Sequence, residues 1–217
     1  MEIFNVNRQA YQHLGVIPWA SKPASNTVPV GTRLTAPGLG YSDWVSKGTH
    51  WAPVDGYAVL KRKNLQSLSG AFPSFAEVLG AFDDFIIPDD LLQSPGAPSF
   101  EVRVQARRLG TLSAAQAFTL QAGTASATNC FGLTYQQSSS SSTAVARLYG
   151  YTSQASSGGN YQGSSIDLYH DSGVMSGNTV AFSSLSGKGL KLYAQNGSTD
   201  TSETWAFHYA MVGVHLW

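Results

Sequence analysis

The sequence predicts an all-β protein whose C-terminal part, residues 81–217, is a jelly-roll-like β-sandwich. Three observations predict this class: short apolar runs bounded by Gly, Asn and Ser clusters, one strictly alternating strand, and few charged residues. Charged residues make up 12% of the chain, about half of the roughly 25% usual in globular proteins. Because 42% of the residues are hydrophobic and 12% aromatic, the chain has ample material for a core.

Residues 1–30 are predicted to form an extended N-terminal arm, because Pro18, Pro23 and Pro29 interrupt any helix. The arm carries too many apolar residues for a free linker. We therefore expect it to pack on a surface, either that of a partner or that of its own domain.

Residues 31–60 are predicted to form a small Trp-rich β module. Segments 41–46 and 49–54 fold back on each other as a hairpin, with Gly48 supplying positive φ in the turn. Trp44 and Trp51 either staple this short ribbon or stack on a base or a sugar.

Residues 61–80 are predicted to be a connector that contains a short helix at 74–79. Ser74 as N-cap and Glu77 at the third helical position form a capping-box pattern. Apolar residues recur through this stretch at helical spacing, so the helix packs either on its symmetry mates or on the sandwich.

Strands follow from residue 81 onward. In 100–108, Phe100, Val102, Val104 and Ala106 alternate with polar residues, which predicts a half-buried strand. Further strands are predicted at 117–121, 130–135, 143–151, 165–170, 179–183, 189–195 and 204–216. The Ser- and Gly-rich loops 136–142 and 153–165 are either recognition loops on a rigid scaffold or inert tips.

The last strand, 204–216, is apolar on both faces, which indicates that both faces are covered. We expect either a subunit interface on one face or a two-layer core within one subunit. The interface residues on the odd-numbered face would be Trp205, Phe207, Tyr209, Met211, His215 and Trp217.

Composition excludes several classes of partner. Thirteen basic and thirteen acidic residues cancel, so no long-range field favours nucleic acid or an anionic membrane. The basic runs 61–63 and 107–108 are expected to be solvated faces or strand-edge guards, with a phosphate or polyanion site as the alternative. The single cysteine, Cys130, excludes an intrachain disulfide and a Cys-based zinc site. The N-terminus lacks the pattern of a secretion signal, and no apolar run reaches the length of a membrane span.

Catalytic groups are also not evident. The acidic pairs 83–84 and 89–90 could resemble a glycosidase acid pair, but adjacent side chains in an extended segment point apart. The consecutive His170, Asp171 and Ser172 cannot align as nucleophile, base and orienting group. His208 or His215 would bind a metal only on a symmetry axis. We therefore expect no enzyme, no metal and no cofactor.

One stretch carries a family resemblance. Residues 31–57 read GTRLTAPGLGYSDWVSKGTHWAPVDGY, and this pattern resembles a short module of tailed-bacteriophage tail-fibre and minor structural proteins. The segment at 85–92, which opens a β-rich tail, is similar to the start of the sandwich in the same proteins. The matching residues of the module are Gly31, Thr32, Arg33, Gly40, Trp44, Val45, Ser46, Gly48, Thr49, Trp51, Pro53, Val54 and Gly56.

The resemblance implies a structural virion protein, most simply a homotrimeric short tail fibre made in the host cytoplasm and displayed on the particle. A capsid decoration or cement protein is the alternative, and a polysaccharide-degrading spike is the third reading. The arm would bind other virion proteins through Ile3, Phe4, Val6, Val16, Ile17 and Trp19. The sandwich head would bind a host surface glycan, with stacking residues, unless they serve only packing, at Tyr149, Tyr151, Tyr161 and Tyr169. The sequence does not define the receptor, the host or the partner of the arm.

Overall fold

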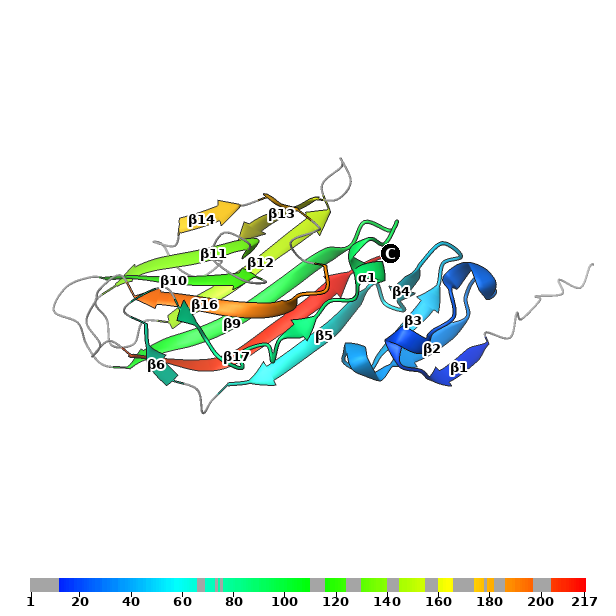
Figure 1. Cartoon of the computed structure of the whole chain (residues 1–217), viewed down its shortest axis with the longest axis horizontal. Coiled ribbons are helices and arrows are strands. Elements are labelled where there is room, and N and C mark those ends of the chain that lie inside the picture. Colours follow the sequence, from blue (N-terminus) through cyan, green and yellow to red (C-terminus); the bar gives the residue numbers. More distant parts are fainter. Residues whose placement is uncertain are drawn as a thin grey trace, which may run out of the picture.

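The structure is a computed structural model, and it describes residues 12–65, 69–72, 74, 76–109, 116–123, 130–139, 145–154, 160–165, 174–177, 179–181, 186–196 and 204–217. These residues form a small four-stranded sheet and a larger β-sandwich. The small sheet lies at one end of the sandwich, near the end of the last strand (Figure 1). Among the described residues, no helix is long and apolar enough to cross a bilayer.

The small sheet organises the N-terminal module, which we define as residues 12–56. Its order is β1-β2-β3-β4, and β3 and β4 are antiparallel neighbours joined by a turn in which Gly48 has φ 87°. The predicted hairpin is therefore confirmed. The elements of the module are β1 (His13–Val16), η1 (Trp19–Ser21), η2 (Ser25–Thr27), β2 (Arg33–Ala36), η3 (Pro37–Leu39), β3 (Ser42–Ser46) and β4 (Trp51–Pro53).

Residues 12–30 do not form the extended arm that the prolines suggested. Strand β1 pairs in parallel with β2, and the 3-10 helices η1 and η2 follow it. Trp19 is buried against the hairpin, with its ring centroid 4.6 Å from that of Trp44. The prolines exclude an α-helix but allow short 3-10 turns, and burial of Trp19 holds these turns on the sheet.

The sandwich consists of two sheets. The first, here called the β9 sheet, has the order β15-β13-β12-β9-β17-β5, with β6 also paired to β17. Its strands are β5 (Tyr57–Asn64), β6 (Ser69–Ala71), β9 (Ser99–Leu109), β12 (Val145–Gln154), β13 (Asn160–Ser165), β15 (Thr179–Ala181) and β17 (Thr204–His215).

The second sheet, here called the β10 sheet, has the order β14-β11-β10-β16-β7, with β8 also paired to β16. Its strands are β7 (Ala76–Glu77), β8 (Phe85–Ile86), β10 (Gln116–Gly123), β11 (Cys130–Ser139), β14 (Val174–Gly177) and β16 (Gly189–Asn196). The one α-helix of the described residues, α1 (Asp89–Leu92), lies between β8 and β9.

Strand pairing in the sandwich is nested. The antiparallel pairs are β9 with β17, β10 with β16, β11 with β14, and β12 with β13. A long hairpin rolled into two layers pairs its strands in this way, as in a jelly roll. Pairing of β9 with β12 joins two of these pairs in the β9 sheet, and pairing of β10 with β11 joins the other two in the β10 sheet. The predicted all-β sandwich is confirmed.

The described residues of 57–80 belong to the sandwich and form neither part of the module nor a helical connector. Strand β5 extends the β9 sheet through residues 61–63, so the predicted module boundary at residue 60 falls inside a strand. At the predicted helix, Ala76 and Glu77 pair with Ala194 and Tyr193, and the N–H of Val78 donates to the Leu192 carbonyl at 2.7 Å. The edge of β16 offers this segment a backbone partner, and that pairing overrides the local capping pattern.

A β-bulge explains why the last strand is apolar on both faces. Phe207 pairs with Ala106 and Tyr209 pairs with Gln105, so His208 is an extra residue in β17. A bulge of one residue exchanges the faces of everything that follows. Trp205 and Phe207 before the bulge therefore face the core, and after it the core residues are Ala210, Val212, Val214 and Leu216, all fully or almost fully buried.

Candidate binding site

Three tryptophans form the centre of the N-terminal module. The rings of Trp19 and Trp44 meet edge to face, and the indole N–H of Trp51 donates to the Pro23 carbonyl at 2.9 Å. Trp44 is fully buried, and Trp19 and Trp51 are 8% and 4% exposed. Rings that are buried to this degree cannot offer a face to a base or a sugar, so Trp44 and Trp51 are staples of the ribbon.

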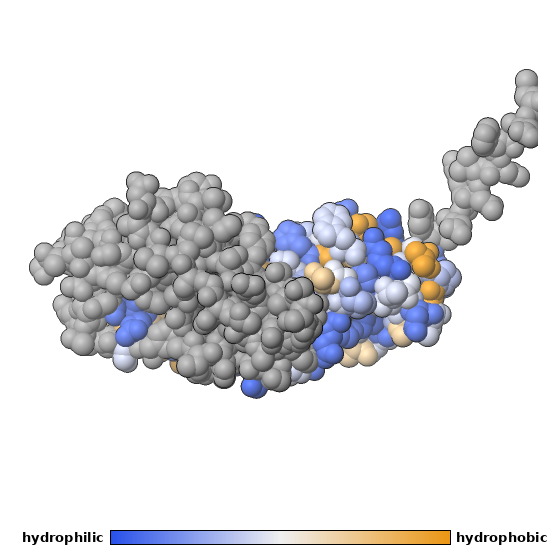
Figure 2. Space-filling view, turned by 90° about the horizontal axis from the view of Figure 1, so that it is seen from above, coloured by the Kyte–Doolittle hydropathy of each residue, from blue (hydrophilic) through white to orange (hydrophobic). Residues whose placement is uncertain are grey.

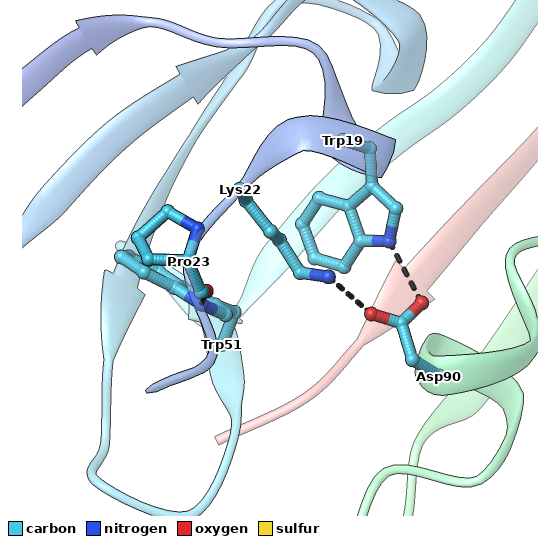
Figure 3. Close-up of polar contacts among 5 residues, drawn as sticks. All are labelled: Trp19, Lys22, Pro23, Trp51 and Asp90. Carbon is cyan, nitrogen blue, oxygen red and sulfur yellow. Dashed lines mark hydrogen bonds and ion pairs between the residues drawn. The ribbon is translucent and has the colours of Figure 1, made fainter. Parts of the chain in front are cut away.

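Asp90 joins the module to the sandwich (Figure 3). Its carboxylate accepts a hydrogen bond of 2.8 Å from Trp19 Nε1 and one from Lys22 Nζ. The Lys22 ammonium also lies 4.2 Å from the centroid of the Trp19 ring, in cation–π contact. Because Asp90 lies on α1 and the other two on η1 and its C-cap, these contacts cross the junction between the two parts.

A pocket of about 470 Å³ opens at this junction. On its module side His50 stands between two partners: Nε2 lies 2.9 Å from the main-chain oxygen of Trp217, and Nδ1 lies 3.0 Å from Thr49 Oγ1. The polar lining combines hydroxyls, an amide, the Asp90 carboxylate, the Lys22 ammonium and the His50 imidazole. The lining residues are Trp19, Lys22, Ala24, Ser25, Asn26, Gly48, Thr49, His50, Trp51, Asp90, Leu91, Ser94 and Pro95.

The four aspartates considered as a paired-acid site serve separate contacts. Asp83 binds Lys63 and lies 3.5 Å from Lys61, and Asp84 lies 3.4 Å from Lys191. Asp89 accepts from the Ser186 hydroxyl at 2.7 Å and from the Gly187 N–H at 3.2 Å. Each carboxylate has partners of its own, so the geometry provides no acid and base facing a common substrate position.

Two of these ion pairs shift a pKa. The hydrogen bond from Lys63, supported by the charges of Lys63 and Lys61, lowers the pKa of Asp83 below its ordinary value. The hydrogen bond to Glu77, with the nearby charge of Asp84, raises the pKa of Lys191. Both groups stay ionised at neutral pH, so neither is poised for proton transfer. Among the described residues, no three His, Cys, Asp or Glu side chains gather as metal ligands.

The outward face of the β9 sheet is the second candidate surface. Register places Tyr149 opposite Arg103 and Tyr151 opposite Glu101, on the face that points away from the core. Register places Tyr161 opposite Gln154, a position of the other face. The predicted tyrosine set is therefore divided: Tyr149 and Tyr151 share a face, Tyr161 does not, and Tyr169 lies outside the described residues.

Glu101 lies at the middle of this outward face and is only 1% exposed. Its carboxylate accepts a hydrogen bond from Arg103 Nε and lies 3.6 Å from His215 Nε2. The ring of Tyr57 packs on that of His215 at a centroid distance of 4.6 Å. The sequence patterns do not identify Glu101 as a site residue. The one sign of its position is that it belongs to the polar residues of an alternating strand.

Three of the six predicted interface residues are buried within the single chain. Trp205 and Phe207 are fully buried in the core, and Met211 is 8% exposed, so these three cannot form a subunit contact. Tyr209 and His215 are half-buried, and Trp217 is 73% exposed. The interface expectation was wrong for the buried residues because the His208 bulge turns Trp205 and Phe207 inward.

The predicted attachment residues also separate. Trp19 is buried in the module and Ile17 is half-buried, whereas Val16 is 67% exposed on the edge strand β1. Ile3, Phe4 and Val6 lie outside the described residues. In Figure 2 hydrophobic residues of the module are scattered among hydrophilic ones on the face shown.

Similarity to known proteins is found among solved structures. No protein-family model matches the chain, and no curated protein matches it. Among solved structures, the chain is similar to the CBM2 module of an evolved Dit protein of Lactobacillus casei BL23 phage J-1. That similarity covers 60% of this chain and 68% of the other, at 10% sequence identity and a TM-score of 0.34.

Proposed function

We propose that the chain is a non-enzymatic structural component of a tailed-phage virion, an appendage whose sandwich binds a glycan on the host surface. The observation that carries the proposal is the 31–57 segment, whose sequence resembles modules of phage fibre and minor structural proteins. In the structure this segment forms most of a small sheet that docks on one end of a β-sandwich (Figure 1).

The junction supports a mechanical role. Asp90 ties the module to the sandwich through Trp19 and Lys22, and His50 contacts the main chain of Trp217. Contacts at two points orient the sandwich relative to the module, as an appendage that presents a binding surface requires.

The sandwich supports a recognition role. A rigid two-sheet scaffold with Tyr149 and Tyr151 at neighbouring positions of one outward face suits stacking on sugar rings. The composition is low in charge and rich in neutral polar residues, as befits a surface-exposed β protein.

Labelling of virions tests the proposal. Antibody against the purified chain, viewed by electron microscopy, should mark the tail. Label on the capsid shell would instead support a decoration protein. Purified chain should also compete with phage for adsorption to host cells, and Tyr151→Ala should weaken this competition. New reducing ends after incubation with host capsule would overturn the non-enzymatic assignment.

Homotrimer formation remains part of the proposal. Its interface would lie away from Trp205, Phe207 and Met211, which are buried in the single chain. Light scattering on the full chain should give three times the mass of one chain, and a monomeric mass would contradict the trimer.

A further inference from the structure

Arginines gather on the outward face of the β9 sheet. Register pairs Arg62 of β5 with Met211, Met211 with Arg103 of β9, and Arg103 with Tyr149 of β12, all in one cross-strand row. Arg107 lies four residues along β9 on the same face. Arg147 is opposite Gln105, between the rows of Arg103 and Arg107. Directly opposed residues share a face, so four arginines from three strands share this one.

Acidic residues are almost absent from the same face. Among the described residues that register places there, Glu101 is the one acid, and its side chain is 1% exposed. The net charge of the chain is zero, so this basic face results from segregation of charge and not from a basic composition.

Four of the six lysines are arranged differently. Lys61 and Lys63 contact Asp83, Lys191 contacts Glu77, and Lys22 contacts Asp90. These lysines serve internal ion pairs at the junction and at sheet edges. The arginines of the outward face, in contrast to these lysines, form a cluster of basic groups on one surface.

Three of these arginine side chains are accessible. Arg62 and Arg107 are exposed, and the side chain of Arg103 is 43% exposed. Glu101 accepts a hydrogen bond from Arg103 Nε and so helps to orient the guanidinium. A planar guanidinium held in this way suits two-point recognition of a carboxylate or a phosphate.

Aromatic residues accompany the arginines. Tyr149 and Tyr151 occupy neighbouring positions of the same face by register, and Tyr209 is half-buried beside them on β17. Tyr57 lies across Gly213, where an added Cβ would come within 2.6 Å of the tyrosine hydroxyl. Aromatic faces suit sugar rings, and the interleaved guanidinium groups suit anionic substituents.

We propose that this face binds an anionic glycan, a polysaccharide that bears carboxylate or phosphate groups. The proposal rests on the proposed function, since it names the class of glycan that the sandwich would take. Charge complementarity with the arginine face is the observation that selects an anionic polymer over a neutral one.

Binding of defined polymers to the full chain tests this. The probes are polygalacturonate for carboxylate, poly(glycerol phosphate) for phosphate, dextran as a neutral polymer and single-stranded DNA as a polyanion without glycan. Calorimetry or biolayer interferometry should show binding of at least one of the two anionic polymers and none of dextran. Binding should weaken at least tenfold between about 50 and about 300 mM salt, because salt screens the attraction between exposed charges.

A matched pair of double variants locates the site. Arg62→Gln with Arg107→Gln should lower the affinity for the anionic polymer at least tenfold. Lys47→Gln with Lys188→Gln removes two positive charges from exposed positions elsewhere and should leave the affinity unchanged. Arg103→Lys keeps the charge but loses the planar fork, and it should weaken binding several-fold. Unchanged melting temperatures for the two double variants would show that folding is intact.

Three results would overturn the proposal: equal binding of dextran, tighter binding of DNA than of both glycans, or equal affinity of the two double variants. Host-cell competition by the purified chain separates this failure from failure of the proposed function. If the chain still competes with phage while neither anionic polymer binds, only the anionic class is wrong.

Discussion

Trp19 donates its indole N–H to the carboxylate of Asp90 at 2.8 Å, across 71 positions of sequence and across the junction of two structural parts. Lys22 contacts both residues, because its ammonium binds the same carboxylate and lies over the same indole ring. The three side chains act as one unit, in which a polar network also orders the aromatic ring.

Replacement of Asp90 by alanine should weaken this junction. The indole N–H of Trp19 would lose its acceptor and Lys22 its counter-ion, and hydrogen bonds to charged groups contribute about 1.5–3 kcal/mol. We expect the free energy of unfolding to fall by about that amount. Denaturant titration followed by tryptophan fluorescence measures the change.

Asp55→Ala is the matched control for that variant, because Asp55 is an exposed aspartate in the turn before β5. It should change the free energy of unfolding by less than about 0.5 kcal/mol. Equal effects of the two replacements would show that the Asp90 contacts do not stabilise the fold.

Phe207→Ala distinguishes burial in the core of one chain from burial at a subunit interface. The Phe207 side chain is fully buried and meets Phe72 edge to face at 5.8 Å, so its removal should cost about 3–5 kcal/mol. The loss should be the same at low and high protein concentration, because the burial occurs within one chain. A loss that shrinks as the protein is concentrated would restore the subunit-interface interpretation.

Gly40→Ala should be strongly destabilising. Gly40 has φ 67°, and an added Cβ would lie 1.9 Å from the Val59 carbonyl oxygen, where the module touches the sandwich strand β5. Gly15 also has positive φ, but an added Cβ there meets no atom within 4 Å. We expect about 1 kcal/mol for Gly15→Ala, from backbone strain alone, and at least about 2 kcal/mol more for Gly40→Ala. Thermal unfolding of both variants makes the comparison, and similar melting temperatures would contradict the close approach.

Asp83→Asn should act on stability in a pH-dependent way. Hydrogen bonding to Lys63 lowers the pKa of Asp83 in the folded protein, so the ion pair stabilises the fold above the ordinary pKa of 3.8. This contribution is lost as the pH falls through the lower folded value. Because Asp83 is 42% exposed, the variant should lose less than about 1 kcal/mol at pH 7. Urea titrations at pH 7 and near pH 3 should show the difference from the parent shrinking, and a constant difference would contradict the ion pair.

Several predictions from the sequence concern local features, and these agree with the structure. The alternation of Phe100, Val102, Val104 and Ala106 with polar residues predicted a strand, and these four residues line the core from β9. Gly48 predicted the turn of the β3–β4 hairpin. Such features depend on backbone preference and on alternation within one segment, which a single stretch of sequence contains.

The sequence predictions for other segments are wrong because pairing with distant strands decides the structure of these segments. The capping-box pattern at Ser74 and Glu77 predicted a helix, yet β16, more than a hundred residues away, offers Glu77 a pairing edge. The apolar residues of 204–216 were read as two covered faces. They form one core face whose phase changes at His208, from Trp205 and Phe207 before it to Ala210 and Val212 after it.

The arrangement of the two candidate binding surfaces, the junction pocket and the arginine face, depends on the fold in the same way. In the sequence Asp90 is one of an adjacent acidic pair with Asp89, and only the fold brings it to Trp19. Arg62, Arg103, Arg107 and Arg147 are scattered over three strands, and only the register of β5, β17, β9 and β12 places them on one face.

The sequence alone determines the all-β class, the hairpin turn and the inward face of β9. These features depend on backbone conformation and period-two alternation, which are properties of neighbouring residues. The path of residues 12–30, the parity of β17 and the partners of each charge were decided by the tertiary structure. These depend on which strand edges and carboxylates distant segments bring into contact, and on the single extra residue, His208, that the pairing of β17 with β9 accommodates as a bulge.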